Sequence, residues 1–189
     1  MKRTILILAC LVPLICIVAA SAQKNNAADQ RSVSKALDFF IADLETHLVP
    51  VAEAMPEEKY SFAPVNGEFK GARTFAEQIK HLAANNYDMA AAILGEKPTP
   101  EMENEAGPDS VRTKAEVIDY LKGSFTALHK AVATIDDKNL LEPVSAGRIR
   151  QWTRLRLTID AVAHSYDHYG QLVEYLRMNG IVPPASRPK

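Results

Sequence analysis

The sequence predicts an all-α protein, a four-helix bundle with a long loop between its first two helices. Apolar residues recur at intervals of three and four over four long segments, and prolines and glycines gather between those segments. No segment shows a convincing alternation of period two, and there is no internal repeat. Four amphipathic helices must bury their apolar faces against one another, and a bundle is the simplest way to do so. Because the connections are long, the sequence does not determine the topology of the bundle.

Residues 1–22 have the organisation of a cleaved signal peptide. A basic pair at positions 2–3 precedes an apolar run over 4–20, and Ala20-Ser21-Ala22 is a small-x-small cleavage site. We therefore predict export to the periplasm or the medium, with no membrane attachment after cleavage. A retained anchor is the alternative, because the run approaches the roughly 18 apolar residues of a spanning helix.

The remainder of the chain has the size of one domain. Residues 23–31 are small and polar and predict a flexible lead-in, and residues 32–189 form the predicted domain. Cleavage leaves 20 basic against 23 acidic residues, a balance that does not favour nucleic acid. Both cysteines, Cys10 and Cys16, lie in the signal, so only nitrogen and oxygen ligands would remain for a metal.

The first predicted helix spans 32–55 and is followed by Pro56, and Pro50 is expected to bend it. Its apolar stripe consists of Val33, Leu37, Phe40, Leu44, Leu48, Val51 and Met55. Residues 56–73 lack periodicity and form a long loop, which is often functional at such a length.

Capping boxes predict the starts of the next two helices. Thr74 with Glu77 begins a helix that continues to Leu94, and Thr113 with Glu116 begins one that continues towards Asp136. Between them, residues 96–112 are expected to be a solvated acidic loop without a role in chemistry. Residues 137–152 are expected to be irregular, and the fourth helix covers 153–179, before Gly180.

His164 and His168 are the strongest functional signal. They lie one turn apart on the apolar stripe of the fourth helix, with Leu157, Ala161 and Leu172. Buried imidazoles without partners cost about 1–3 kcal/mol each, and a metal ion held by two histidines at i and i+4 would satisfy both. A hydrogen-bonded core pair, or a pair at a solvent-exposed helix edge, is the alternative.

A third ligand would come from another helix, and periodicity does not choose it. His47 lies beside Leu44 and Val51, His81 lies one step off the stripe of its helix, and His129 borders the stripe of the third helix.

Three segments resemble the DinB-like superfamily of bacterial four-helix-bundle proteins. They are residues 54–64 (AMPEEKYSFAP), residues 73–82 (RTFAEQIKHL) and residues 164–172 (HSYDHYGQL). The resemblance implies that His81, His164 and His168 bind a divalent metal. Nitrogen ligands favour zinc or nickel, and iron or manganese is the alternative. For His47 and His129, the resemblance implies only structural or solvent-exposed roles. Three nitrogen ligands would leave an open position, as in catalytic sites, and Asp160 is a candidate to orient His164.

Members of that superfamily resemble metal-dependent transferases and isomerases that activate a small thiol, and others are regarded as hydrolases. Export to an oxidising compartment makes hydrolysis of a small molecule at least as plausible as thiol transfer. A metal- or small-molecule-binding module without activity is the alternative, and a purely structural bundle is a third. No catalytic residue, substrate or native metal is assigned. A homodimer is possible, and we expect no nucleic-acid partner.

Overall fold

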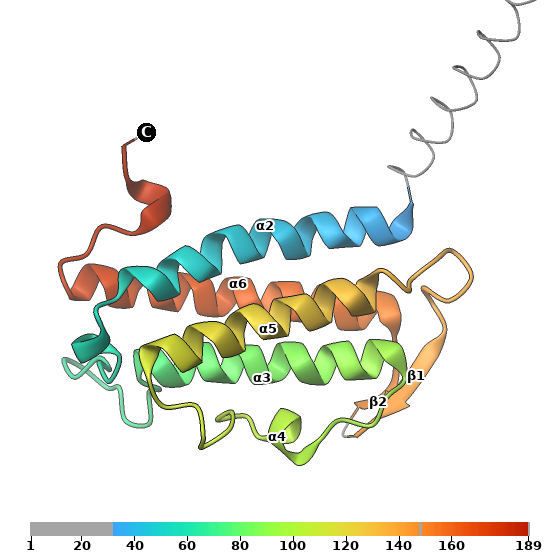
Figure 1. Cartoon of the computed structure of the whole chain (residues 1–189), viewed down its shortest axis with the longest axis horizontal. Coiled ribbons are helices and arrows are strands. Elements are labelled where there is room, and N and C mark those ends of the chain that lie inside the picture. The colour runs from blue at the N-terminus through green and yellow to red at the C-terminus, as the bar shows by residue number, and fades with distance from the viewer. Residues whose placement is uncertain (1–31, 148, 189) are drawn as a thin grey trace, which may run out of the picture.

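The computed structural model describes residues 32–147 and 149–188 (Figure 1). The predicted signal peptide and lead-in lie outside these residues. Among the helices of the described part, none has the length and apolar character needed to cross a membrane.

Four long helices make up most of the described chain, which confirms the all-α prediction. They are α2 (Val33–Ala54), α3 (Phe75–Leu94), α5 (Lys114–Val132) and α6 (Arg154–Met178). The predicted ends agree to within one or two residues, except that α5 ends at Val132 and not near Asp136. The loop between α2 and α3 contains only a short turn, η1 (Glu57–Lys59), and a second turn, η2 (Pro184–Ser186), follows α6.

The topology, which the sequence left open, places α3 next to α5 and α6, and α2 on the other side of the same two helices. In Figure 1, α3 and α5 run in one direction while α2 and α6 run in the other. The connection from α3 to α5 therefore returns along the length of the bundle, and it carries the short helix α4 (Pro100–Glu103) beside α3. Because α3 and α6 are antiparallel neighbours, side chains near the start of α3 can meet those in the second half of α6.

The core follows the predicted stripes with one exception. Leu44, Leu48 and Val51 of α2 are buried as expected, but Phe40 is 53% exposed and the neighbouring Ile41 is buried in its place. Phe40 instead lines an apolar surface groove between α2 and α6. The prediction for Phe40 was wrong because consecutive Phe39, Phe40 and Ile41 leave the phase of the stripe ambiguous.

A β-hairpin occupies the segment predicted to be irregular. Strand β1 (Pro143–Ala146) pairs antiparallel with β2 (Ile149–Thr153), with an irregularity in the register between Val144 and Ala146. Two strands this short, one of them interrupted by the left-handed residue Gln151, carry too few alternating positions to be recognised. The helix α4 was likewise not predicted. The hairpin leads directly into Thr153, which caps α6.

The helix starts are fixed by the predicted capping boxes. The Thr74 hydroxyl accepts a hydrogen bond from the Glu77 N–H at 3.2 Å, and the Glu77 carboxylate accepts one from the Thr74 N–H at 2.7 Å. Thr113 and Glu116 repeat this arrangement at α5. The end of α3 is closed by Gly95 in the left-handed conformation. These caps set where α3 begins, and so which of its residues face α6.

Replacing the cap should destabilise the protein. We expect Thr74→Ala to lower the free energy of unfolding by about 1 kcal/mol, because a donor at the start of α3 loses its acceptor. Urea unfolding followed by circular dichroism measures the effect. Thr126→Ala is the matched control, because Thr126 is exposed within α5 and its hydroxyl only donates to the Lys122 carbonyl. Equal losses in the two variants would contradict the assigned cap.

Candidate metal centre

Three histidines from two helices converge on one point between α3 and α6. His81 lies near the start of α3, and His164 and His168 lie one turn apart around the middle of α6. His81 is 8% exposed and His168 is 6% exposed, while His164 is partly buried. Together they form a cluster that could hold a metal ion, since one ring nitrogen of each lies within 4.8 Å of the others.

The same nitrogen atom of each ring points inward. The Nε2 atom of His164 is 3.2 Å from Nε2 of His81 and 3.0 Å from Nε2 of His168. Two ligands of a tetrahedral ion, each about 2.0–2.1 Å from it, are about 3.3 Å apart. The nitrogen spacing is therefore close to that of a metal centre with three imidazole ligands.

The tautomer of His81 is fixed by a backbone group. Its Nδ1–H donates to the carbonyl oxygen of Glu105 at 2.7 Å, so in the neutral ring Nε2 carries the lone pair. Glu105 belongs to the 96–112 loop, which was expected to be solvated and without a role in chemistry. That expectation overlooked a backbone carbonyl, whose position depends on how the loop folds over α3 and not on the type of residue.

Hydrogen bonds among the three rings do not satisfy all of their nitrogens. His164 Nε2 faces two other nitrogens, and a single N–H there can be directed well at only one of them. The Nδ1 atoms of His164 and His168 are buried without a hydrogen-bond partner among the described residues. Three lone pairs directed at one cation would resolve the crowding at Nε2.

The electrostatic setting favours the neutral form of His164 and of His168. Burial, followed by the repulsion of the neighbouring histidines, lowers the pKa of His168 to about 4. Burial is also the main cause that lowers the pKa of His164, with a contribution from His81. Neutral imidazole is the form that binds metals, so the lone pairs are available at physiological pH.

Arg73 lies at the edge of the cluster. Its positive charge is among the causes that lower the pKa of His164 and of His168. Its guanidinium group lies 3.8 Å from the carboxylate of Glu105, and its backbone carbonyl accepts a hydrogen bond from the Tyr175 hydroxyl at 3.1 Å. The end of the loop that follows α2 is thus tied to α6 beside the histidines. Arg73 was not predicted from the sequence to be part of the site, because it belongs to a loop and carries no periodic signal.

His47, which periodicity could not separate from His81, lies elsewhere. Its Nδ1–H donates to the carbonyl of Asp43 at 2.7 Å within α2, and its ring packs edge-on against Tyr169. Asp160 raises the pKa of His164 by its charge, which weakly opposes the effect of burial. It does not orient the ring as the sequence suggested, because His164 Nδ1 has no hydrogen-bond partner in the part of the chain that the structure describes.

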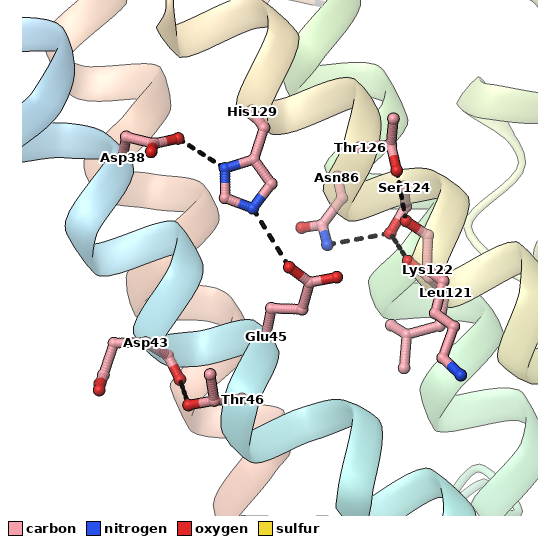
Figure 2. A network of polar contacts seen from close by, with 10 residues as sticks. All are labelled: Asp38, Asp43, Glu45, Thr46, Asn86, Leu121, Lys122, Ser124, Thr126 and His129. Carbon is pink, nitrogen blue, oxygen red and sulfur yellow. Dashed lines mark hydrogen bonds and ion pairs between the residues drawn. The ribbon is translucent and has the colours of Figure 1, made fainter.

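His129 forms a separate bridge between α5 and α2 (Figure 2). Its Nδ1 lies 2.5 Å from an oxygen of Asp38, and its Nε2 lies 3.2 Å from an oxygen of Glu45. Carboxylates accept on both sides, so the doubly protonated ring fits this position. The two carboxylates lie on opposite nitrogens of the ring, an arrangement in which one ion cannot contact all three groups.

The fold and the cluster define a class, a helical bundle with a buried site of three histidines between two antiparallel helices. The sequence model of the DinB superfamily matches residues 41–172, a range that contains all three histidines. The chain belongs to the DinB superfamily, as the resemblance implied. Among the curated proteins compared with the chain, none matches it.

The His129 bridge predicts a pH-dependent part of the stability. Burial disfavours the charged ring, but the hydrogen bonds with Asp38 and Glu45 outweigh it and raise the pKa of His129 above its ordinary value. The stabilisation is therefore fully present below about pH 6.5 and is lost as the pH rises through the raised pKa.

We expect His129→Gln to lower the free energy of unfolding by about 1 kcal/mol or less near pH 5.5, because the pair is partly solvated, and by less near pH 8.5. Denaturant titrations at the two pH values measure the difference. Asp38→Asn should reduce the same pH dependence. A loss that is unchanged between the two pH values would rule out the charged bridge.

Proposed function

We propose that the protein binds a divalent metal ion through His81, His164 and His168, and that this centre serves the hydrolysis of a small molecule. The convergence of three Nε2 atoms carries the proposal, with that of His164 lying 3.2 Å from that of His81 and 3.0 Å from that of His168. Nitrogen ligands of this kind suit zinc or nickel, and they also accommodate iron or manganese.

Three protein ligands are the number found in catalytic zinc sites, where a further position stays open. When bound, the ion supplies Lewis acidity that lowers the pKa of a water or thiol and so provides a nucleophile at neutral pH. The protein's own part is to hold the three rings in place. Glu105 orients His81 through its carbonyl, and α6 fixes the separation of His164 and His168.

Hydrolysis, and not thiol transfer, is proposed because the predicted signal peptide would carry the protein to an oxidising compartment. The positive charge of Arg73 beside the histidines would favour a substrate, or a reaction intermediate, with negative charge. Thiol transfer is the alternative reaction, and the activity test distinguishes it from hydrolysis.

The metal site is tested by metal analysis of protein purified without an affinity tag. We expect the wild type to bind one equivalent of zinc and to be stabilised by about 2.7 kcal/mol when free zinc is 100-fold above its Kd. His164→Ala should weaken zinc binding by more than the roughly 10–100-fold that loss of a ligand's hydrogen-bond partner costs.

His47→Ala is the matched control, because it removes a histidine from the neighbouring helix α2 that does not belong to the cluster. It should bind zinc like the wild type. Wild-type protein that takes up neither zinc nor nickel would overturn the proposed site.

Activity is tested with a panel of chromogenic esters, amides and phosphate esters, each with the zinc-loaded protein. Turnover should disappear on chelation and in His164→Ala, while His47→Ala stays active. Turnover that appears only with an added thiol such as cysteine would replace hydrolysis by thiol transfer. Metal binding without turnover of any class would favour a binding module.

A further inference from the structure

An apolar groove lies on the surface between α2 and α6, which run side by side in the same direction (Figure 1). The groove has a volume of about 380 Å³, and Thr158 is the one polar residue of its lining. It adjoins α2, whereas the histidine cluster adjoins α3, so the two features lie on different faces of α6. The apolar lining includes Leu37 and Phe40 of α2 and Leu155, Ile159 and Val162 of α6.

Large apolar side chains are exposed at this groove. Phe39 is 67% exposed, Phe40 is 53% exposed and Ile159 is 56% exposed. The rings of Phe39 and Phe40 contact each other edge to face, with 5.7 Å between their centroids. Phe40 and Ile159 both line the groove, so the exposed apolar surface is continuous from one helix to the other. A continuous apolar surface is typical of an interaction site, whereas single exposed apolar residues are common on any protein.

The sequence limits what can cover the groove. Residues 23–31, which precede α2, contain no apolar side chain larger than that of alanine, so they are unsuited to fill it. The apolar run over 4–20 belongs to the predicted signal peptide and is expected to be removed. These two considerations favour an occupant from outside the mature chain.

Two charged side chains border the groove on α6. Arg156 lies three residues before Ile159, and Asp160 lies one residue after it. Within residues 32–147 and 149–188, neither charge has an ion-pair partner. The Arg156 guanidinium stacks on the ring of Trp152 at 3.8 Å, which holds the cation in place. Its N–H groups lie in the guanidinium plane, so stacking leaves them available to a carboxylate.

A second copy of the chain offers the complementary charges. A two-fold axis that crosses α6 near Ile159 places the α6 helices of two copies antiparallel, so residues before Ile159 in one copy face residues after it in the other. Arg156 of each copy then faces Asp160 of the other, and this contact occurs twice. Because Phe40 lines the same groove as Ile159, the axis also brings the exposed Phe39 and Phe40 rings of the two copies together.

We propose that the groove between α2 and α6 is the interface of a symmetric homodimer, with an apolar centre and two Arg156–Asp160 pairs at its edge. The exposed parts of Phe39 and Phe40 would cover roughly 200–300 Å² per copy. A standard interface buries about 800 Å² per partner, so with the rest of the groove this interface is small and the dimer is reversible. The proposal is independent of the metal function, because the histidines lie on another face of α6.

Sedimentation velocity over a concentration series tests the interface with the purified full chain. We expect a reversible equilibrium between monomer and dimer, with a Kd of roughly micromolar order. Arg156→Asp and Asp160→Arg should each weaken the dimer at least tenfold, because two attractive charge pairs are replaced by two repulsive ones. Lys130→Asp is the matched control, since it reverses an exposed charge on α5, away from the groove, and it should dimerise like the wild type.

Mixing the two variants separates a lost interface from a lost fold. When Arg156→Asp is mixed with Asp160→Arg, both charge pairs of the mixed dimer are again attractive, with reversed polarity. The mixture should therefore dimerise more tightly than either variant alone, and misfolded variants would not recover in this way. If the mixture stays as weak as the single variants, the proposed symmetry is wrong.

The same experiment with a chain that lacks residues 1–22 identifies other occupants of the groove. We expect this chain to dimerise like the full chain. Association that requires residues 1–22 would assign the groove to that segment and overturn the proposal. A protein that stays monomeric up to about 1 mM, with or without binding of dodecanoate as an apolar probe, would overturn it as well.

Discussion

The crowding of three imidazoles between α3 and α6 is the constraint on which the functional part of this structure depends. Their Nε2 atoms lie close enough that a cation would satisfy all three lone pairs, whereas hydrogen bonds among them do not. Burial and the repulsion of neighbouring histidines lower the pKa of His164 and of His168 and so favour their neutral form. Burying three imidazoles lowers the stability of a bundle that holds no ligand. Buried polar groups of this kind are typically retained for binding or catalysis.

The rest of the fold serves to hold these two helices in register. Thr74 and Glu77 fix the start of α3 seven residues before His81, and the hairpin delivers the chain to Thr153, the cap of α6. Phe75, Leu82 and Leu172, which lie close to the histidines in the sequence, are fully buried apolar residues of the core. Farther along the bundle, Asn86 of α3 donates to the hydroxyl of Ser124 of α5 at 3.2 Å (Figure 2). A buried polar pair of this kind adds specificity to the packing of α3 on α5.

Much of this fold can be predicted from sequence, because long helices carry many periodic positions and their ends carry caps. The site is less predictable. Spacing alone singles out His164 and His168, but His81 enters through the family resemblance, since it lies off the apolar stripe of its helix. Glu105 contributes a backbone carbonyl and Arg73 lies at a loop end, so their roles depend on tertiary contacts that no local pattern encodes. The hairpin is missed for a similar reason, because strands of four and five residues are too short for a clear alternation.

One geometric relation joins the histidine cluster to the neighbouring pair of glutamines, Gln78 and Gln171. In antiparallel helices, a step of three residues backwards along α3 corresponds to a step of three residues forwards along α6. The register that brings His81 to His168 therefore also brings Gln78 to Gln171, whose side chains meet at 2.8 Å. A shift of α3 by one turn would separate both pairs at once. The pairing of Gln78 with Gln171 and the convergence of the histidines are thus two consequences of the same packing, so an ion bound by the histidines would also stabilise the register that the two glutamines share.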